Sequence, residues 1–429
     1  MITINVEGAL RFADKKSVAQ TLEQAKEAYR QVLTGAGPGN EWLGWRHLLQ
    51  SPNDAELDRV ERKAAAIREE ADVFIVCGIG GSYLGAKAVI EAVNGLIPNG
   101  KPEILYAGHQ ISGRYLEQLI RYLEEPKATG EAKRVYLNVI SKSGTTLETA
   151  IAFKVLREWM EKQYGEEASR RIIATTGPKG GVLNNMIDER GYDKYIIPND
   201  VGGRFSVLTP VGLLPIAVAG IDIQTLFYGA VKKFRECEKS ADDMLEYAAL
   251  RYHFQETDKA MDVIGSFEPE LNAFTGWIQQ LLGESEGKEG KGIFPVSAAY
   301  STDLHSIGQM IQQGKRNMIE TFLVVEESGS RLTVSESDFK ADELDYLSGK
   351  EFHEINKKAL EGTIEAHIEG GVPVFRINIQ KLNAQNLGEL IYFYELFTAV
   401  YVYMLQVNPF NQPGVEDYKK AMYRNLGKK

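Results

Sequence analysis

Short apolar runs alternate with amphipathic stretches from residue 72 onward, and this alternation constrains the fold more than any other feature of the sequence. Residues 73–77 and 135–140 are nearly uninterrupted apolar runs of strand length, and residues 147–164 have the length and pattern of a helix. Strands that alternate with helices are typical of a parallel sheet covered on both faces, with right-handed crossovers. The sequence therefore predicts an α/β fold.

The alternation occurs in two series. In the first, we predict strands at 73–77, 104–106, 135–140, 172–174 and 195–197, and helices at 84–93, 112–123 and 147–164. In the second, we predict strands at 263–264, 320–326 and 374–379, and helices at 272–282, 304–313 and 387–407. We therefore expect two doubly wound, mostly parallel sheets flanked by helices, each binding ligands at the carboxyl ends of its strands.

A chain of 429 residues is too long for one typical core. We expect an N-terminal helical segment at 1–70, whose helices at 17–33 and 54–70 pack outside the first sheet. The remaining expected units are α/β domains at 71–230 and 261–410, a helical connection at 231–260 and a C-terminal helical segment at 411–429.

Charge and cysteine content exclude several classes of protein. The net charge is −10 and no run of Lys and Arg is long enough for a basic arm, which argues against nucleic-acid binding. The two cysteines, Cys77 and Cys237, indicate neither a disulfide framework nor a metal site. The first residues also lack the features of a secretory signal. We therefore expect a protein of the reducing cytoplasm.

One stretch approaches the length of a membrane span. Residues 390–407 carry a single charge, Glu395, near their centre, where an ionised group is costly in a bilayer. Asn386 with Glu389 has the pattern of a capping box, and Asn408-Pro409 has the pattern of a helix stop. We predict a buried core helix and no membrane association.

A glycine-rich turn follows the first predicted strand. The stretch Gly78-Ile79-Gly80-Gly81-Ser82 opens the helix at 84–93, where free backbone amides favour an anion or a sugar hydroxyl. It is not a dinucleotide fingerprint, and Lys87 lies one place too late for a P-loop, which disfavours a kinase. A plain tight turn remains the alternative.

The strongest functional signal follows the strand at 135–140. The stretch Ser141-Lys142-Ser143-Gly144-Thr145-Thr146 places four hydroxyl side chains within six residues at a helix N-terminus. Capping a helix needs one hydroxyl, whereas a phosphate monoester needs many donors. We therefore predict a phosphate site here.

Further candidates are weaker when each is taken alone. Arg204 follows two glycines and suits an oxyanion, although a surface salt bridge explains it equally well. Gln280 and Glu284 share a helix face, so Glu284 could be a general base in a cleft, although most glutamates are solvated. His305 is compatible with a capped helix start, and residues 410–419 with a Pro-Gly turn into a helix.

Together these stretches resemble the glucose-6-phosphate isomerase family, also called phosphoglucose isomerase. Residues 199–212, N-D-V-G-G-R-F-S-V-L-T-P-V-G, are similar to one family signature, and residues 410–419, F-N-Q-P-G-V-E-D-Y-K, are similar to the other. The I-G-G-S turn, the S-K-S-G-T-T loop and the series Gln280, Glu284, His305 occur in the family order. The resemblance runs from about residue 40 to the C-terminus.

The resemblance implies a fold of two sugar-isomerase-type sheets and a homodimer with shared active sites. It also implies reversible isomerisation of glucose 6-phosphate and fructose 6-phosphate, in glycolysis and gluconeogenesis, through ring opening and a cis-enediol. No cofactor and no metal are implied, and no set of His, Cys, Asp and Glu in the sequence has metal-ligand spacing. The preference for glucose over mannose comes from the resemblance alone.

The resemblance also implies roles for individual residues. Glu284 would be the base that moves a proton between C2 and C1, and Arg204 would face the enediolate. His305, from the neighbouring subunit, and Lys419 would assist ring opening. The substrate-binding residues would be Gly81, Ser82, Ser141, Lys142, Ser143, Thr145, Thr146 and Gln280, with the serine–threonine loop and the Lys142 amide on the phosphate.

The sequence departs from the family pattern in two places. Ser143-Gly144 stands where many members carry Thr-Phe. Residues 285–290 are unusually charged, so we expect the loop that they form to be more mobile.

A non-catalytic sugar-phosphate sensor would carry an output module such as a helix-turn-helix, which the pattern does not indicate. An amino-sugar phosphate isomerase or aldolase-like enzyme would keep the serine–threonine loop but lack the two signatures.

Overall fold

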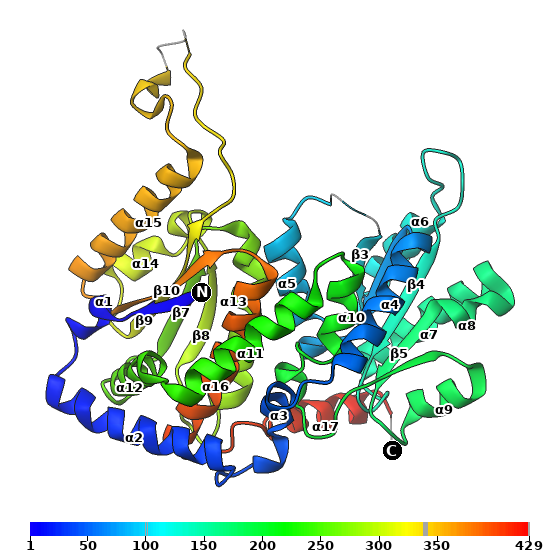
Figure 1. The fold of residues 1–429 in the computed structure, drawn as a ribbon, viewed down its shortest axis with the longest axis horizontal. Coiled ribbons are helices and arrows are strands. Elements are labelled where there is room, and N and C mark those ends of the chain that lie inside the picture. The colour runs from blue at the N-terminus through cyan, green and yellow to red at the C-terminus, as the bar shows by residue number, and fades with distance from the viewer. Residues whose placement is uncertain (99, 101, 338–341, 428–429) are drawn as a thin grey trace.

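Two five-stranded sheets with helices on their faces form the architecture of the chain (Figure 1). The computed structural model describes residues 1–98, 100, 102–337 and 342–427. The predicted fold class, two mostly parallel sheets flanked by helices, is confirmed. The domain boundaries drawn from the sequence stay a prediction.

The first sheet has the strand order β3-β2-β4-β5-β6, and every pair in it is parallel. Its strands are β2 (Val73–Cys77), β3 (Glu103–Ala107), β4 (Val135–Ile140), β5 (Ile172–Thr176) and β6 (Asp193–Ile196). The intervening helices are α5 (Leu84–Asn94), α6 (Gly113–Glu124), α7 (Leu147–Tyr164), α8 (Ala168–Arg171) and α9 (Val182–Arg190). Cys77 pairs with Val139, so β2 and β4 end at the same edge and the two turns that follow them are neighbours.

The second sheet has the order β1-β10-β9-β7-β8, with only β1 antiparallel among the described strands. Its strands are β1 (Ile2–Asn5), β7 (Met261–Ser266), β8 (Phe294–Ala299), β9 (Met318–Glu327) and β10 (Val374–Lys381). The helices that follow them are α13 (Asn272–Glu286), α14 (Gly308–Gln313), α15 (Phe352–Glu369) and α16 (Ala384–Met404). The remaining helices are α1 (Glu7–Leu10), α2 (Lys15–Thr34), α3 (Gly44–Gln50), α4 (Asp54–Glu70), α10 (Pro210–Val218), α11 (Ile223–Lys239), α12 (Asp242–Glu256) and α17 (Val415–Asn425).

The N-terminal segment differs from its prediction. Residues 1–70 are not all helical, because β1 adds to the edge of the second sheet, where Ile2 pairs with Ile379. The helix predicted at 17–33 also does not lie on the first sheet: α2 contacts α12 and α16 beside the second sheet. A four-residue strand whose partner lies at the far end of the chain leaves little local signal.

One apolar core joins the two sheets. It contains Val76 of β2, Ile264 of β7 and Phe375 of β10, together with Trp277 of α13 and Phe397 of α16. The helices α5 and α13, one from each series, pack against each other between the sheets (Figure 1). A site built from both halves is therefore held on a single packed body.

Helix α16 runs through this core and is buried along its whole length, as predicted. It begins earlier than expected, because Asn383 rather than Asn386 caps it by accepting a hydrogen bond from the Asn386 amide. Glu389 instead accepts hydrogen bonds from Lys232 and from the amide of Ile2. Glu395 is 1% exposed, and neither of its carboxyl oxygens has a hydrogen-bond partner in the described chain. Within the described residues, no helix is long and apolar enough to span a membrane.

Candidate active site

The glycine turn after β2 brings three predicted segments together. The short helix Gly80–Ser82 follows β2, and a Cβ on Gly81 would lie only 2.0 Å from the carbonyl oxygen of Gly203. Gly80 has φ +57°, and a Cβ there would lie 2.7 Å from Gln280 Nε2. At Gly81 backbone atoms leave no room for a side chain, and at Gly80 the positive φ makes any larger residue strained. The turn therefore contacts the helical turn Gly203–Phe205 on one side and α13 on the other.

Arg204 is the most densely bonded side chain of the site. It is 3% exposed, and its Nε donates to Ser285 Oγ at 2.7 Å. Nη1 donates to Gln412 Oε1 at 3.0 Å and to Glu284 Oε2 at 3.4 Å. Nη2 donates to the carbonyls of Pro409 at 2.5 Å and Asn411 at 3.2 Å. A guanidinium has five N–H donors, so the chain itself accounts for all of them.

Arg204 remains positively charged although it is buried. Burial lowers the pKa of the guanidinium to about 10, against the opposing attraction of the Glu284 carboxylate. Because that pKa is still well above neutral pH, the side chain is a cation there. The structure therefore holds a fixed positive charge beside Glu284, and the alternative of a surface salt bridge is wrong.

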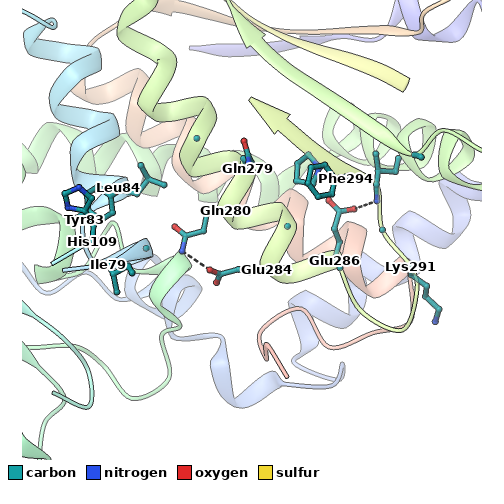
Figure 2. Close-up of a pocket in the computed structure, with 18 residues that line it drawn as sticks. Ile79, Tyr83, Leu84, His109, Gln279, Gln280, Glu284, Glu286, Lys291 and Phe294 are labelled. Atoms are coloured by element: carbon teal, nitrogen blue, oxygen red, sulfur yellow. Dashed lines mark hydrogen bonds between the residues drawn. The ribbon is translucent and has the colours of Figure 1, made fainter. Parts of the chain in front are cut away.

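Glu284 and Gln280 lie on one face of α13, as their spacing predicts. Gln280 Nε2 donates to Glu284 Oε1 at 3.0 Å (Figure 2). Arg204 bonds the other carboxylate oxygen, so the carboxylate lies between an amide and a guanidinium. The Glu284 side chain is 33% exposed. Its carboxylate is therefore held in place yet remains accessible from a cavity.

That cavity lies between the two halves of the chain and has a volume of about 760 Å³. Gly80, Tyr83 and His109 line it from the first half, and Gln280 and Glu284 line it from α13 (Figure 2). Its outer part reaches Lys291 and the exposed Phe294 at the start of β8. It has room for a substrate the size of a sugar phosphate.

The serine–threonine loop connects β4 to α7. The Gly144 amide donates to Ser141 Oγ at 3.1 Å, and the hydroxyls of Ser143 and Thr145 are 2.9 Å apart. Thr146 occupies the N-cap position of α7, yet its side chain makes no capping hydrogen bond. The hydroxyl cluster at this helix N-terminus is therefore more than a cap.

Lys142 anchors the loop to the first signature segment. Its Nζ donates to the carbonyl of Asn199 at 2.8 Å and to that of Val201 at 3.2 Å, and it lies 4.5 Å from the centre of the Trp42 ring. Burial lowers its pKa, while Asp200 acts in the opposite direction. The Lys142 side chain is therefore structural, which leaves the backbone amide as the group available to a ligand.

The loop does not line the cavity that contains Glu284. Ser141 and Gly144 line a separate, smaller cavity of about 140 Å³ against α7 and α9. The loop and Glu284 are instead connected through contacts: Lys142 to Val201, Gly203 to Gly81, and Arg204 to Glu284. Both lie along the edge where β2 and β4 end.

Lys419 and His305 lie apart from Glu284. Lys419 is on α17 and donates to Glu416 at 2.8 Å; α17 reaches the serine–threonine loop, where Tyr423 Oη donates to the Thr145 carbonyl at 3.5 Å. His305 ends the short helix Thr302–His305 after β8 and is exposed. Neither side chain is in the lining of the cavity. Ser82, in the turn after β2, is half-buried.

The structure adds three residues to those predicted. Ser285 and Gln412 bond Arg204 directly, and Lys288, in the loop after α13, donates to the carbonyls of Ser285 and Asn408. Gln412 lies within a stretch that the sequence had already singled out. For the other two, only the charge of residues 285–290 gave a signal, and it was interpreted as mobility.

A buried ion network stabilises the end of α13 behind Glu284. Arg251 Nη1 and Nη2 each donate to Glu286 at 2.9 Å, and Nε donates to Asp262 at 2.9 Å. Glu286 also accepts a hydrogen bond from the Ile293 amide at 3.0 Å. In the described part of the chain, no group of three or more His, Cys, Asp and Glu side chains is arranged to hold a metal ion.

Known proteins resemble the chain over nearly its whole length. A family model described as phosphoglucose isomerase matches residues 56–428. Glucose-6-phosphate isomerases from Fusobacterium nucleatum and Shouchella clausii are each 44% identical to the chain, over 100% of it and 96% of their own length. A hypothetical protein from Thermus thermophilus has a TM-score of 0.88 at 28% identity, over 99% of this chain and 100% of its own. A glucose-6-phosphate isomerase from Chlamydia trachomatis shares the fold, with a TM-score of 0.80 at 19% identity, over 99% and 88%.

Proposed function

The chain belongs to the phosphoglucose isomerase family, and on that premise we propose that it interconverts glucose 6-phosphate and fructose 6-phosphate as an aldose–ketose isomerase of glycolysis and gluconeogenesis. The observation that carries the proposal is the Glu284 carboxylate, which opens into a cavity while Gln280 and Arg204 hold it from two sides. A sensor would not need a base paired with a fixed cation. Neither would an amino-sugar isomerase be expected to carry both family signatures.

The reaction needs a proton to move between adjacent carbons. The Glu284 carboxylate takes the proton from C2 of the open-chain aldose, and the C–H electron pair forms the C1–C2 double bond of a cis-enediol as the aldehyde oxygen gains negative charge. Glu284 then returns the proton to C1 while the hydroxyl proton on O2 passes to O1, which leaves a ketone at C2 and a hydroxyl group at C1. The same carboxylate serves both steps because the two carbons are adjacent.

Arg204 stabilises the charge that develops on the enediolate. Its N–H donors are already bonded within the chain, so it acts as a fixed positive charge in a site sheltered from water. This requires no metal ion and no cofactor. Gln280 orients the Glu284 carboxylate and the substrate hydroxyls near it.

The phosphate end of the substrate binds at the serine–threonine loop. The hydroxyls of Ser141, Ser143, Thr145 and Thr146 and the Lys142 amide supply the donors, and the α7 N-terminus supplies positive potential. Gly81 and Ser82 line the sugar. The adjacent ends of β2 and β4 support this arrangement, since they set the loop beside the turn that contacts α13.

Ring opening involves His305 and Lys419, and the active form is a cytoplasmic homodimer. His305 is exposed on its own subunit and outside the cavity lining, which supports its delivery to the site of a second subunit. Between β9 and α15, the described residues 328–337 and 342–351 extend away from the body (Figure 1), and their Leu332 and Tyr346 are 64% and 69% exposed. A second subunit packed against this segment would cover both apolar side chains.

A coupled assay tests the function. Fructose 6-phosphate should be converted to glucose 6-phosphate in the presence of a chelator, with mannose 6-phosphate as the comparison sugar. Glu284→Gln should reduce kcat by about a hundred- to ten-thousandfold, as loss of a catalytic base commonly does, and leave KM within a few-fold. Glu289→Gln, an exposed residue in the next loop, is the matched control. Near-normal turnover by Glu284→Gln would exclude Glu284 as the base.

A further inference from the structure

The loop between α13 and β8 carries two lysines that are both bonded to backbone carbonyls. Lys288 Nζ donates to the carbonyl of Ser285 at 2.7 Å and to that of Asn408 at 2.5 Å. Lys291 Nζ donates to the carbonyl of Leu405, at the end of α16, at 3.0 Å. The charges that distinguish this loop in the sequence therefore connect it to the segment at 405–408.

Lys288 joins the same two segments as Arg204. Ser285 offers its hydroxyl to Arg204 and its carbonyl to Lys288. Asn408, whose carbonyl accepts from Lys288, immediately precedes Pro409, whose carbonyl accepts from Arg204. The end of α13 and the turn at 408–412 are thus cross-linked twice, and each cross-link limits the movement available to the other.

The bonds of Lys288 do not require its charge. Burial lowers the pKa of its ammonium to about 7, with the Arg204 guanidinium acting in the same direction and the Glu284 carboxylate against it. A neutral amine still has two N–H donors, as many as the two carbonyls that Lys288 contacts. Glu286, the last residue of α13, is already bonded to Arg251. Lys288 therefore holds the two segments together through its hydrogen bonds, whether or not it carries a charge.

We propose that Lys288 is a positioning residue for the isomerisation: it fastens the turn at 408–412 to the end of α13 and so fixes the Arg204 guanidinium relative to the Glu284 carboxylate. The catalytic consequence rests on the proposed function. Because Arg204 acts on the charge that develops during the reaction, loosening it lowers kcat. The phosphate contacts at 141–146 are separate, so KM changes little.

Kinetics of three variants test the proposal. Lys288→Met should lower kcat for fructose 6-phosphate about 10- to 100-fold, the size expected when a catalytic group is displaced by about 1 Å, with KM within about threefold. Lys288→Arg, which retains donors, should recover most of the loss. Lys133→Met removes the same kind of paired bond, from Lys133 Nζ to the carbonyls of Tyr122 and Glu125, outside the cavity and the Arg204 network, and should keep kcat within about twofold.

A crystal structure of Lys288→Met supplies a readout that does not depend on activity. The Arg204 guanidinium should move away from the carbonyls of Pro409 and Asn411. An unmoved Arg204, equal kcat values for Lys288→Met and Lys133→Met, or an effect confined to KM would each overturn the proposal. If the unmodified enzyme converts neither sugar phosphate, the proposed function fails, while the position of Arg204 in the variant still decides the role of Lys288.

Discussion

Replacing Glu395 with Gln should change the pH dependence of stability in a direction that the structure fixes. Glu395 lies in the middle of α16, 1% exposed and with no hydrogen-bond partner for its carboxyl oxygens in the described chain. Burial raises the pKa of its carboxyl group well above the ordinary value for a glutamate. In the folded protein the group is therefore a neutral acid, whereas in the unfolded chain it ionises above about pH 4.3.

The sign and size follow from linkage. A raised folded pKa gives stability that is fully present below the unfolded pKa and is lost as pH rises toward the folded pKa. The loss is about 1.4 kcal/mol for each pH unit while the folded carboxyl stays neutral. As pH rises above the unfolded pKa, the native enzyme should thus lose unfolding free energy relative to Glu395→Gln, which has no such titration, and the loss should continue until the pH reaches the folded pKa.

Glu389 is a matched control on the same helix. Burial alone would raise its pKa, but hydrogen bonds from Lys232 and Gln385 and the charge of the chain's amino group lower it below 4.5. Its stabilising contribution is present above the unfolded pKa and is lost as pH falls through the folded pKa. Glu389→Gln should therefore be less stable than the native enzyme at pH 7, and the difference should shrink in acid.

Chemical denaturation of the three proteins at half-unit steps from about pH 4.5 to 8 measures the slope caused by Glu395, and further steps below about pH 4.5 measure the loss of the Glu389 contribution. The free-energy difference between Glu395→Gln and the native enzyme should widen steadily with pH, and that for Glu389→Gln should not. A difference for Glu395→Gln that is constant over this range would mean that the buried carboxyl is ionised in the folded state, which would refute the reasoning.

Two further predictions concern substrate binding and assembly. The double variant Ser143→Ala with Thr146→Ala should raise KM about tenfold or more, since hydrogen bonds to a charged group contribute about 1.5–3 kcal/mol each, and should leave kcat nearly unchanged; steady-state kinetics with an unaltered KM would place the phosphate elsewhere. Mixing inactive Glu284→Gln and His305→Ala proteins under conditions that exchange subunits should restore about a quarter of the native activity, because half of the randomly formed dimers then contain one intact site; no recovery would mean that each subunit uses its own histidine.

The sequence was most informative where local pattern determines structure. The apolar run of β2 and the hydrophobic face of α7 are bounded by turn residues, and both elements have the predicted ends. The strand β8 was missed because F-P-V-S-A-A contains Pro295 and small residues. A proline is tolerated there because β8 is at the edge of its sheet.

In the candidate site, too, the contacts set by local pattern could be predicted and the contacts between distant residues could not. The contact between Gln280 and Glu284 follows from their helical spacing. The hydroxyl cluster follows from the four serines and threonines within residues 141–146. The contacts of Arg204 with Ser285, Gln412 and the carbonyls at 409 and 411 join residues 81 to 208 positions apart. Such pairings depend on how the two sheets pack together, which neither periodicity nor spacing encodes.

The separation between Arg204 and its carbonyl acceptors also governs when the enzyme can first work. Arg204 is synthesised 205 residues before Pro409. Its guanidinium therefore lacks these carbonyl acceptors until nearly half of the chain has been added after it. A nascent chain with both sheets already folded would still have an open end beside α13. Catalytic competence would therefore arrive with the last segment to emerge, after the scaffold is complete.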